Sequence, residues 1–391
     1  MTPSPQPIYD VAVLGLGGMG AAAAWHCARH GAKVLGLEQF GPVHDRGSSH
    51  GEWRIYREAY FESPVYAPLA VRAGELWEEL GRIEGVPMLK RCGALMVSSE
   101  NSPVHLGCLK SATQHLLPYE LPDAARLHEL FPALRHIPGQ AAFFEPRAGA
   151  VRVEQSITAH LKLAENAGAN LRFNERVQNV RDEQSDEGVT IETDSGSYCA
   201  RRLISAAGAW SGKILDECGC ALRPARVVQA WFESNLNALP VDRLAPVFFI
   251  EAPDSTWLYG VPPADPSAPG ASWKFGFHNR YESCDPDTVR RTVSGEEIDA
   301  FRYYLNNLLP GLVGKFKRAN VCLYEMTPDE HFAIGIHPRR PSIVVAGGFS
   351  GHGFKFTPVV GEILAELALD NRTRYDIAFF SPDRLHRSTF S

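Results

Sequence analysis

The sequence predicts an α/β protein in which a nucleotide-binding domain built on a parallel sheet is interleaved with a second, mainly antiparallel β domain. Glycine-rich loops recur at the start, middle and end of the chain, each between an apolar run and a segment with helical spacing of apolar residues. The stretches between these units are typical of short strands. A chain of 391 residues also has room for two domains of ordinary size.

The apolar runs before the glycine loops are short and continuous, as expected of strands buried in a parallel sheet. The predicted strands, each with its loop, are 10–14 with 15–20, 202–205 with 206–212, and 342–346 with 347–353. We expect one nucleotide-binding domain formed by residues 1–84, 146–220 and 321–391. Residues 85–145 and 221–320 form the predicted second domain, with strands expected at 93–97, 245–251, 257–261 and 272–278 and a helix at 296–309.

Composition and charge exclude several classes of protein. Apolar residues make up 45% and charged residues 21%, so disorder and coiled coil are not expected. The net charge of −6 offers no basic surface for nucleic acid. The uncharged stretch 11–28 is rich in glycine and is better read as strand, loop and helix than as a membrane span. With only 8 cysteines, the chain does not resemble a secreted disulfide scaffold, and we expect a cytoplasmic protein.

The first glycine loop has the spacing Gly-x-Gly-x-x-Gly, formed by Gly15, Gly17 and Gly20. Gly15 permits the tight turn, Gly17 lets the backbone approach a pyrophosphate, and Gly20 lets the helix pack closely on the strand. The helix N-terminus then faces the phosphates. A second strand over 33–37 leads to Glu38, whose carboxylate can bind ribose hydroxyls. This order predicts a dinucleotide site, and Glu38 favours FAD or NAD over NADP.

The segment from Gly47 to Arg57 carries several cations. If a helix begins here, His50, Arg54 and Arg57 lie on one face, at positions i, i+4 and i+7. A solvated basic face is the ordinary reason for such a pattern. Trp53 and its apolar neighbours instead indicate a partly buried segment, in which cations need anionic partners. Periodicity supports the two interpretations equally.

Two stretches alternate in the manner of strands. Alternation over 272–278 places Trp273, Phe275 and Phe277 on a core face and Lys274, Gly276 and His278 on the other. Gly276 would leave room there for a flat ligand, although a surface lysine on an edge strand is a common alternative. Cys322 and Tyr324 also share one face of a strand. A lone cysteine in such a place is usually a small buried apolar side chain.

The third glycine loop is followed by Lys355 and by a helix start at Thr357-Pro358. We expect Thr357 to be the N-cap and Pro358 the first helical residue, with the helix running towards residue 369. The helix N-terminus brings partial positive charge to the loop, which suits an anionic ring or a carboxylate. Lys355 beside it has no reason to be buried unless it pairs with an anion.

The sequence contains no recognisable hydrolase or metal motif. The residues 205–209 do not form a Gly-x-Ser-x-Gly turn, and the 14 histidines include no His-Glu-x-x-His pair. No cysteine pair has the spacing of a zinc site. We therefore expect no metal.

Together these residues resemble the monomeric sarcosine oxidase family of flavoenzymes, which includes N-methyltryptophan oxidase and L-pipecolate oxidase. The similarity extends over essentially the whole chain. It is densest in four motifs, which are Gly47-Ser-Ser-His-Gly51 with Arg54 and Arg57, Lys274-Phe-Gly-Phe-His278, Cys322-Leu-Tyr324, and Gly348-Phe-Ser-Gly-His-Gly-Phe-Lys-Phe356. The resemblance implies a Rossmann-type FAD-binding domain of the glutathione-reductase-like kind.

The resemblance also implies that FAD is attached through the sulfur of Cys322 to the methyl group of the flavin's benzenoid ring. Arg54 and Lys274 correspond to basic residues on the two faces of the flavin, and the lysine is the family's oxygen-activating residue. The remaining residues expected to bind the cofactor are Gly15, Gly17, Gly20, Glu38, Ser49, His50, Gly348, Gly351, Gly353 and Lys355.

The substrate site follows from the same match. Arg57 and Lys355 correspond to the pair that holds the substrate carboxylate, while His278 and Tyr324 correspond to residues that line the substrate cavity. The family often has Gly-Asp-Thr-Arg where this chain has Gly51-Glu52-Trp53-Arg54. We expect Trp53 to reshape the cavity or its entrance. The loop 262–270 also departs from the family, and both departures concern the choice of substrate.

The implied reaction is the oxidation of a secondary-amine amino acid such as sarcosine, another N-methyl amino acid or L-pipecolate. An imine forms and is hydrolysed to an aldehyde and an amine, and O2 is reduced to H2O2. We expect a monomer with a small amino-acid substrate and O2 as partners, and neither nucleic acid nor membrane.

Three alternatives remain open. An FAD amine dehydrogenase would use an acceptor other than oxygen. A nicotinamide-linked dehydrogenase would leave Cys322 and the third glycine loop unexplained. A non-catalytic flavin-binding protein would not need Arg57, Lys274 and Lys355 together.

Overall fold

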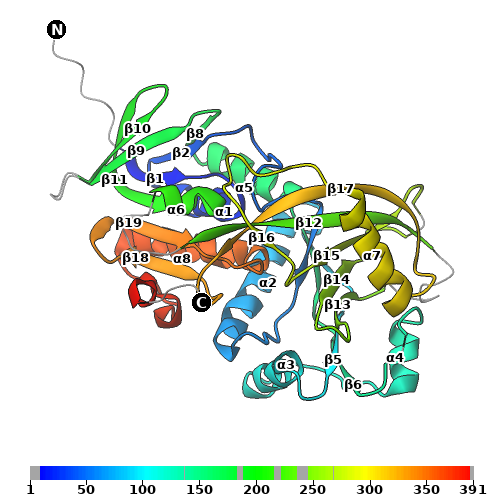
Figure 1. The fold of residues 1–391 in the computed structure, drawn as a ribbon. Helices are drawn as coiled ribbons and strands as arrows, with labels where there is room; N and C mark the ends of the chain where they lie inside the picture. The colour runs from blue at the N-terminus through cyan, green and yellow to red at the C-terminus, as the bar shows by residue number, and fades with distance from the viewer. Residues whose placement is uncertain are drawn as a thin grey trace, which may run out of the picture.

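The computed structural model describes residues 9–135, 137–182, 188–214, 222–235, 245–266 and 268–387. Figure 1 shows a helix-covered sheet on one side of the molecule and a largely antiparallel sheet on the other. The long strands β12 (Arg223–Ser234) and β17 (Val313–Met326) extend from one part towards the other. β17 therefore spans the domain boundary that the sequence places between residues 320 and 321, whereas the boundary at 220–221 lies outside the described residues.

The first sheet has a parallel core in the order β19, β11, β1, β2 and β8. Strands β18, β10 and β9 extend it in antiparallel fashion. The strands expected at 10–14, 33–37, 202–205 and 342–346 all fall in this sheet. Its bounds are β1 (Tyr9–Leu14), β2 (Val34–Glu38), β8 (Asn170–Phe173), β9 (Val177–Asp182), β10 (Val189–Thr193), β11 (Ser197–Ser205), β18 (Ala333–His337) and β19 (Arg340–Gly347).

The two faces of this sheet are covered differently. Side chains alternate along β1, so that Val11 and Val13 join the core beneath the helices and Ala12 and Leu14 pack with β9 and β10. Helix α8 lies close to α1 because Gly361 faces Ala22, where a Cβ atom would come within 2.6 Å of the alanine Cβ. The helices of this part are α1 (Gly18–Arg29), α2 (Ala67–Glu84), α5 (Glu154–Asn166), α6 (Ser211–Ile214) and α8 (Thr357–Asp370).

The second sheet has the order β16, β12, β15, β14, β13, β5 and β6, with β17 paired to β12. Its neighbours are antiparallel except β13 and β5. Phe275 packs on Trp273 and Phe248 over one face, and α7 closes the core that they form. The bounds are β5 (Ala94–Ser99), β6 (Gln140–Glu145), β13 (Val247–Glu251), β14 (Trp257–Val261), β15 (Ser272–Phe277), β16 (Glu282–Ser283), α3 (Pro103–Gln114), α4 (Ala124–Leu130) and α7 (Gly295–Leu308).

A small third sheet and several single turns complete the fold. In the small sheet β7 pairs with both β3 and β4 in antiparallel fashion. The remaining bounds are β3 (Trp53–Tyr56), β4 (Leu89–Arg91), β7 (Gly149–Arg152), and the 3-10 turns η1 (Pro64–Tyr66), η2 (Gly208–Trp210), η5 (Phe354–Phe356), η6 (Ala378–Phe380) and η7 (Pro382–Arg387). The prediction of an α/β fold with a parallel nucleotide-binding sheet and an antiparallel second sheet is confirmed.

The helix considered for residues 47–57 is wrong, because this segment contains β3. Gly51 and Glu52 have φ angles of +92° and +68°, and two consecutive left-handed residues prevent a helix from running through them. The carboxylate of Glu154 accepts hydrogen bonds from both of their N–H groups, at 2.6 Å from Gly51 and 2.9 Å from Glu52. β3 then pairs with β7, about a hundred residues along the chain. This long-range pairing outweighs the helical spacing of the cations.

The start of α8 differs from its prediction by one residue. Phe356 is the N-cap, Thr357 is the first helical residue, and no side chain caps the helix. The reason is the 3-10 turn η5, which ends at Phe356 and feeds directly into α8. Thr357 is consequently free to turn its hydroxyl elsewhere.

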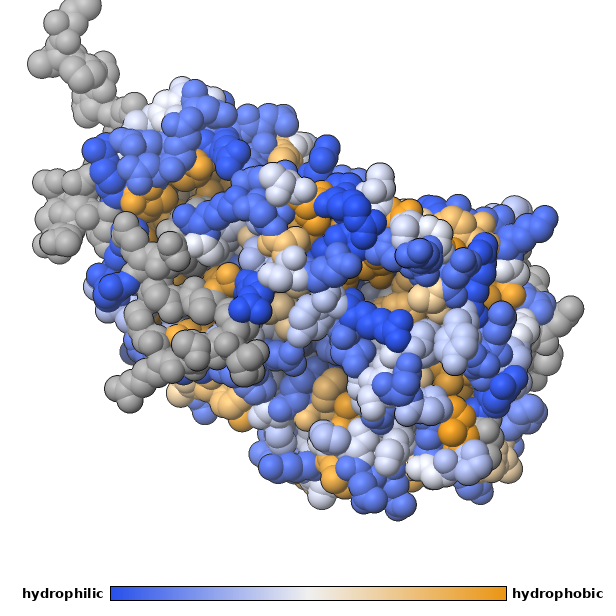
Figure 2. Space-filling view, in the orientation of Figure 1, coloured by the Kyte–Doolittle hydropathy of each residue, from blue (hydrophilic) through white to orange (hydrophobic). Residues whose placement is uncertain are grey.

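The surface gives no sign of a large apolar face in the view of Figure 2, where apolar side chains lie in small patches between polar ones. Within the described ranges, none of the helices has the length and apolar character that crossing a membrane requires.

Candidate active site

A cavity of about 520 Å³ runs from the first glycine loop to the third. One end is lined by Gly15, Gly17 and Glu38, and the other by Arg57 and Lys355. Segments from both sheets contribute to its wall. Of the residues expected at the site, those lining the cavity are Gly15, Gly17, Glu38, Ser49, Arg54, Arg57, His278, Cys322, Tyr324, Gly351, Gly353 and Lys355, whereas Gly20, His50, Lys274 and Gly348 do not line it.

The glycine loop at the first end is tightly packed. Gly15 has φ of +84°, and a Cβ atom there would lie 2.6 Å from the carbonyl oxygen of Ala206. A Cβ atom on Gly20 would lie 1.7 Å from the carbonyl oxygen of Gly15, so only glycine lets α1 approach β1 this closely. Gly17, in contrast, has open space apart from the Ser49 hydroxyl at 3.8 Å. The N-terminus of α1 therefore faces a cradle that a side chain would fill.

Glu38 lies at the end of β2 and is nearly buried. Its carboxylate accepts hydrogen bonds from the N–H groups of Leu16, at 2.9 Å, and Phe40, at 3.0 Å. His44 lies 3.3 Å from the same carboxylate. These contacts hold the carboxylate at the cavity wall, where ribose hydroxyls can meet it.

The cavity fits a dinucleotide with a flat ring system. The Thr357 hydroxyl lines the cavity beside Gly18 of the first glycine loop, is buried, and has no hydrogen-bond partner among the described residues. A buried hydroxyl without a partner is unfavourable unless a ligand supplies one. With the glycine cradle and this buried polar group side by side, as a Cβ atom on Gly18 would lie 3.1 Å from Thr357 Oγ1, the residues present fit FAD.

Cys322 and Arg54 meet midway along the cavity. The Cys322 thiol is 1% exposed, and its sulfur lies 3.5 Å from Arg54 Nη2 and 3.4 Å from the carbonyl oxygen of Ser48. Arg54 also donates to that carbonyl, at 2.9 Å. β17 and β3 thus bring together a thiol and a guanidinium that are far apart in the sequence.

Lys274 lies behind the cavity wall rather than on it. Its ammonium donates to the carbonyl oxygens of Gly51, at 2.8 Å, and Trp53, at 2.7 Å, and only 2% of the residue is exposed. Burial, and then the charge of Arg54, lower the pKa of Lys274 well below its usual value. β15 lies between β12 and β14, so Lys274 is not on an edge strand. Gln229 lies on the cavity wall beside this ammonium and the Gly51 turn.

His50 is also buried outside the cavity. Its Nδ1 lies 3.4 Å from the amide of Asn320, and its Nε2 has no hydrogen-bond partner within the part of the chain described. Burial, followed by the charges of Arg54 and Lys274, lowers the pKa of His50 to about 3. The imidazole is therefore neutral at pH 7.

Two expectations about space in the cavity are wrong. Gly276 does not leave room for a flat ligand, because the hydroxyl of Tyr259 occupies the place where its Cβ would be, at 2.2 Å. Trp53 does not line the cavity itself, because its ring packs against Arg152, whose guanidinium lies 4.7 Å from the ring centre. The indole also borders a small separate hollow with part of the loop 262–270.

Arg57 already has an anionic partner in this structure. Both oxygens of Glu62 lie 2.7 Å from its Nη2, and the guanidinium is stacked between the rings of Tyr60 and Phe61 at 3.9 and 4.3 Å. Burial opposes ionisation of the carboxyl, but Arg57, with His352 and Lys355, lowers the pKa of Glu62 to about 2. Arg57 and Glu62 both line the cavity. A carboxylate therefore occupies the guanidinium in this conformation.

Lys355 lies beside this pair and is 6% exposed. Its ammonium donates to the Tyr60 hydroxyl at 2.9 Å and to the carbonyl oxygen of His352 at 2.7 Å. Burial, and then the charge of Arg57, lower the pKa of Lys355 well below its usual value. Because an ammonium has three donors, one remains for a ligand in the cavity.

His278 and Tyr324 complete this end, with ring centres 6.2 Å apart. Burial is the main cause that lowers the pKa of His278 to about 4, so its ring is neutral at pH 7. Burial likewise raises the pKa of Tyr324 well above its usual value and keeps the phenol protonated. A Cβ atom on Gly351 would lie 2.5 Å from the Tyr324 ring, which explains a glycine at this point of the third loop.

Sequence reasoning missed several residues of the cavity. Glu62 and Gln229 line the cavity, and the Tyr60 hydroxyl contacts Lys355 without lining it, yet none of the three belongs to a recognised motif. The loop 206–210 was recognised as glycine-rich, yet none of its residues was assigned to the site, although it lines the dinucleotide end. Across the described ranges, no cluster of three or more His, Cys, Asp or Glu side chains could hold a metal ion.

Comparison with known proteins shows the family to which the chain belongs. The pattern of the family described as FAD dependent oxidoreductase matches residues 10–367. The monomeric sarcosine oxidase of Streptomyces avermitilis is 44% identical over 381 residues, covering 97% of this chain and 98% of that one. The N-methyl-L-tryptophan oxidase of Salmonella dublin is 36% identical over 382 residues, covering 97% and 99%.

Solved structures show the same fold. The open form of NikD, an unusual amino acid oxidase essential for nikkomycin biosynthesis, superposes with a TM-score of 0.84 at 27% identity, over 96% of this chain and 97% of that chain. The resemblance to the monomeric sarcosine oxidases is thereby confirmed, and FAD is the cofactor of the family. The chain belongs to the FAD dependent oxidoreductase family.

Proposed function

We propose that this chain oxidises the carbon next to the nitrogen of a secondary amino acid, such as sarcosine, another N-methyl amino acid or L-pipecolate, with O2 as the electron acceptor. The observation that carries the proposal is the continuity of one cavity from the glycine loop, past Arg54 and Cys322, to Arg57 and Lys355. Relatives named for sarcosine and N-methyl-L-tryptophan support the substrate class.

Bound FAD would accept a hydride equivalent from that carbon and pass two electrons to O2. Arg57 and Lys355 come from different segments and would hold the substrate carboxylate between them. Charge-assisted hydrogen bonds in a dry site fix position well, and positioning contributes several orders of magnitude to a rate. Glu62 must first release Arg57, so we propose that the substrate carboxylate replaces the Glu62 carboxylate.

The chain's remaining side chains keep the reacting end apolar. Phe61, Phe249 and Phe349 line the cavity there and exclude water. His278, neutral because of its lowered pKa, adds no positive charge that would repel the substrate amine. The amine can therefore lie near the aromatic wall while its carboxylate is held.

Arg54 and Lys274 supply positive charge that responds to charge formed during the reaction. Both are oriented by backbone carbonyls, which fixes their positions before the reaction begins. Preorganised positive charge in a low-dielectric site stabilises negative charge as it develops. We propose that Lys274 promotes reoxidation by O2 through this field, acting from behind the cavity wall beside Gln229.

We further propose that the flavin is covalently bound through Cys322. The buried thiol on the cavity wall, next to the Arg54 cation, supports this link. The holoenzyme is precipitated with acid, and we expect a yellow pellet from the wild type and a colourless pellet from Cys322→Ser. Cys92→Ser, which alters a thiol outside the cavity, is the control and should keep the yellow pellet. A colourless wild-type pellet would contradict the link.

The reaction itself is tested with a panel of sarcosine, larger N-methyl amino acids, L-pipecolate and primary amino acids. We expect peroxide and, for N-methyl substrates, formaldehyde in equal amounts. Flavin reduction without peroxide, followed by rapid reoxidation by an artificial acceptor, would instead identify a dehydrogenase. We also propose that the protein is a monomer, in keeping with relatives named monomeric sarcosine oxidase, and that it is cytoplasmic. Its two predicted domains would bind FAD and substrate respectively.

A further inference from the structure

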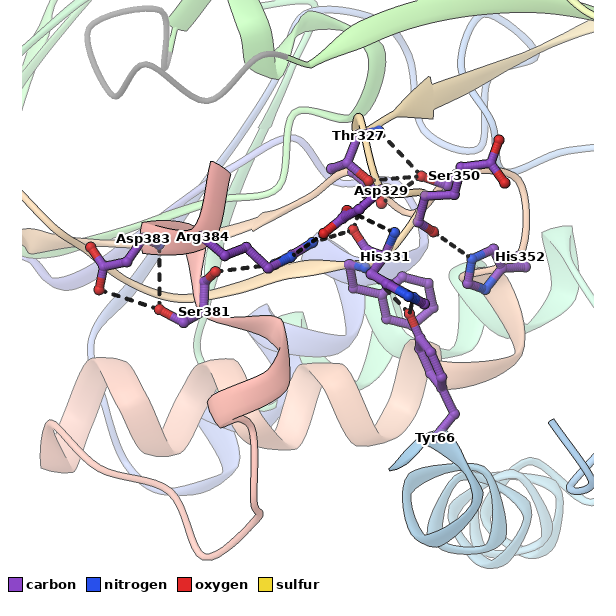
Figure 3. Close-up of polar contacts among 12 residues, drawn as sticks. Tyr66, Thr327, Asp329, His331, Ser350, His352, Ser381, Asp383 and Arg384 are labelled. Carbon is purple, nitrogen blue, oxygen red and sulfur yellow. Dashed lines mark hydrogen bonds and ion pairs between the residues drawn. The ribbon is translucent and has the colours of Figure 1, made fainter. Parts of the chain in front are cut away.

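The C-terminal turn η7 is hydrogen-bonded to the loop 327–331, which lies between β17 and β18. Arg384 of η7 donates from Nε to Asp329 Oδ2 at 2.7 Å and from Nη2 to Asp329 Oδ1 at 3.2 Å and to the carbonyl oxygen of His331 at 2.6 Å (Figure 3). Its Nη1 also donates to the carbonyl oxygen of Ser381, at 3.1 Å. A two-point ion pair with added carbonyl contacts fixes the loop in orientation as well as position.

The loop 327–331 is also held by hydrogen bonds of Thr327. Thr327 Oγ1 donates to the carbonyl oxygen of His331 at 2.8 Å, and the Thr327 N–H donates to the hydroxyl of Ser350 at 3.3 Å (Figure 3). Glu330, at the tip, has φ of +58°, a left-handed conformation that an L-residue rarely adopts. Such a conformation persists when its surroundings hold it.

The tip reaches the cavity through one hydrogen bond. The carbonyl oxygen of Glu330 lies 3.0 Å from Nε2 of His352, a buried residue on the cavity wall. A carbonyl can only accept, so Nε2 carries the proton of the neutral ring. Nδ1, at 2.8 Å from the Tyr60 hydroxyl, must then accept from it.

The Tyr60 hydroxyl, oriented by His352, in turn orients the Lys355 ammonium. Because the hydroxyl donates its hydrogen bond to His352, its oxygen is left to accept one from the Lys355 ammonium, at 2.9 Å. The main chain of His352 accepts a second hydrogen bond from the same ammonium, at 2.7 Å. Two of the three Lys355 donors are thereby fixed, and the third is left for the cavity.

We propose that Arg384 is a positioning residue for the carboxylate site: by holding the 327–331 loop, it fixes the ring and tautomer of His352 and, through Tyr60, the direction of the Lys355 ammonium. This inference rests on the proposed role of Lys355 in binding the substrate carboxylate. The C-terminal turn thus acts on the site without touching substrate or cofactor.

The test compares Arg384→Gln with Arg374→Gln in the FAD-loaded enzyme. Arg374 is a matched control, because it lies in the same C-terminal region but pairs with Glu362 and Glu366 of α8. The dissociation constant of acetate is measured from the change it causes in the flavin spectrum, alongside KM for the amino acid and the melting temperature. We expect Arg384→Gln to weaken acetate binding and raise KM by about three- to tenfold, with the rate of flavin reduction at saturation within about twofold of wild type. Arg374→Gln should lower the melting temperature only.

A double-mutant cycle separates the inference from its premise. In a Lys355→Met background, Arg384→Gln should cause no further loss of acetate affinity, because its effect passes through Lys355. If Lys355→Met itself leaves acetate binding unchanged, the proposed carboxylate site is wrong. If Lys355→Met weakens binding but Arg384→Gln does not, or if the two arginine variants behave alike, the positioning role is wrong. Should Arg384→Gln fail to fold, Asp329→Asn breaks the same ion pair and is read in the same way.

Discussion

Two pairs of cations lie at the cavity or just behind its wall, and their partners differ. Arg54 and Lys274 donate to backbone carbonyls, and among the described residues neither has a carboxylate within ion-pair distance. Arg57, beside Lys355, is instead paired through two short contacts with Glu62. Backbone carbonyls are neutral, so they offset no charge of the first pair, whereas the Glu62 carboxylate offsets the charge of Arg57 in the second.

The difference separates two kinds of chemistry. An uncompensated pair of cations, already oriented, suits negative charge that appears only during the reaction. A pair with a carboxylate partner suits the exchange of that carboxylate for one on a ligand, because the interactions lost and gained are alike. We therefore expect changes in the first pair to affect reoxidation and changes in the second pair to affect binding.

The largest effect is expected for Lys274→Met. Removing this ammonium should slow reoxidation of the reduced flavin by O2 by about two to three orders of magnitude, because preorganised charge is lost. Binding of acetate should change little, since the ammonium lies behind the cavity wall. Mixing anaerobically reduced enzyme with oxygenated buffer measures the rate, and an unchanged rate would contradict the role given to Lys274.

Arg57→Gln should act on binding instead. Loss of a charge-assisted hydrogen bond of about 1.5–3 kcal/mol predicts acetate binding about 10- to 150-fold weaker. Reoxidation of the reduced enzyme should stay near the wild-type rate. A spectral titration measures the acetate affinity. If Lys274→Met weakened acetate binding as much as Arg57→Gln does, the two pairs of cations would not differ in function.

The pH dependence of acetate binding tests the role of Lys355 in the second pair. The lowered pKa of Lys355 means that its ammonium loses its proton at lower pH than an exposed lysine would. Acetate affinity should therefore fall by about tenfold as the pH rises towards the ordinary lysine pKa of about 10.4, and binding should take up protons as it does. The Lys355→Met variant should lack this slope, and a slope that persists in it would assign the titration to another group.

Glu62→Gln should have the smallest effect, in the opposite direction from Arg57→Gln. The amide still occupies the same space but no longer competes as an anion, so acetate should bind about threefold more tightly. KM for the amino acid should fall with it. Weaker binding in Glu62→Gln would mean that this carboxylate supports the site rather than competing with the substrate.

Much of the fold was predictable because its signals are local. The order of β1, the glycine loop, α1, β2 and Glu38 occupies one continuous stretch, in which Gly20 is required by its near neighbour Gly15. The alternation in β15 was likewise sufficient to separate Lys274 from its aromatic neighbours. Such features depend on backbone period and steric limits, which the sequence displays directly.

The errors share a different cause, which is that distant segments decide the outcome. Glu154 and β7, about a hundred residues away, impose a strand where the cations have helical spacing. Tyr259 from the neighbouring strand fills the space beside Gly276. The pairing of Glu62 with Arg57, five residues apart, is an exception that is local in sequence, and it was missed because a single glutamate after a strand carries no pattern that marks it as an ion-pair partner.

The comparison is tested most directly by measuring both half-reactions in Lys274→Met and Arg57→Gln. Flavin reduction is followed anaerobically at increasing amino-acid concentration, and reoxidation is followed separately with O2. We expect Arg57→Gln to raise the half-saturating amino-acid concentration and to leave reoxidation unchanged, whereas Lys274→Met should slow reoxidation and leave that concentration unchanged. If each variant impairs both half-reactions to the same extent, the division of the site between its two pairs of cations is contradicted.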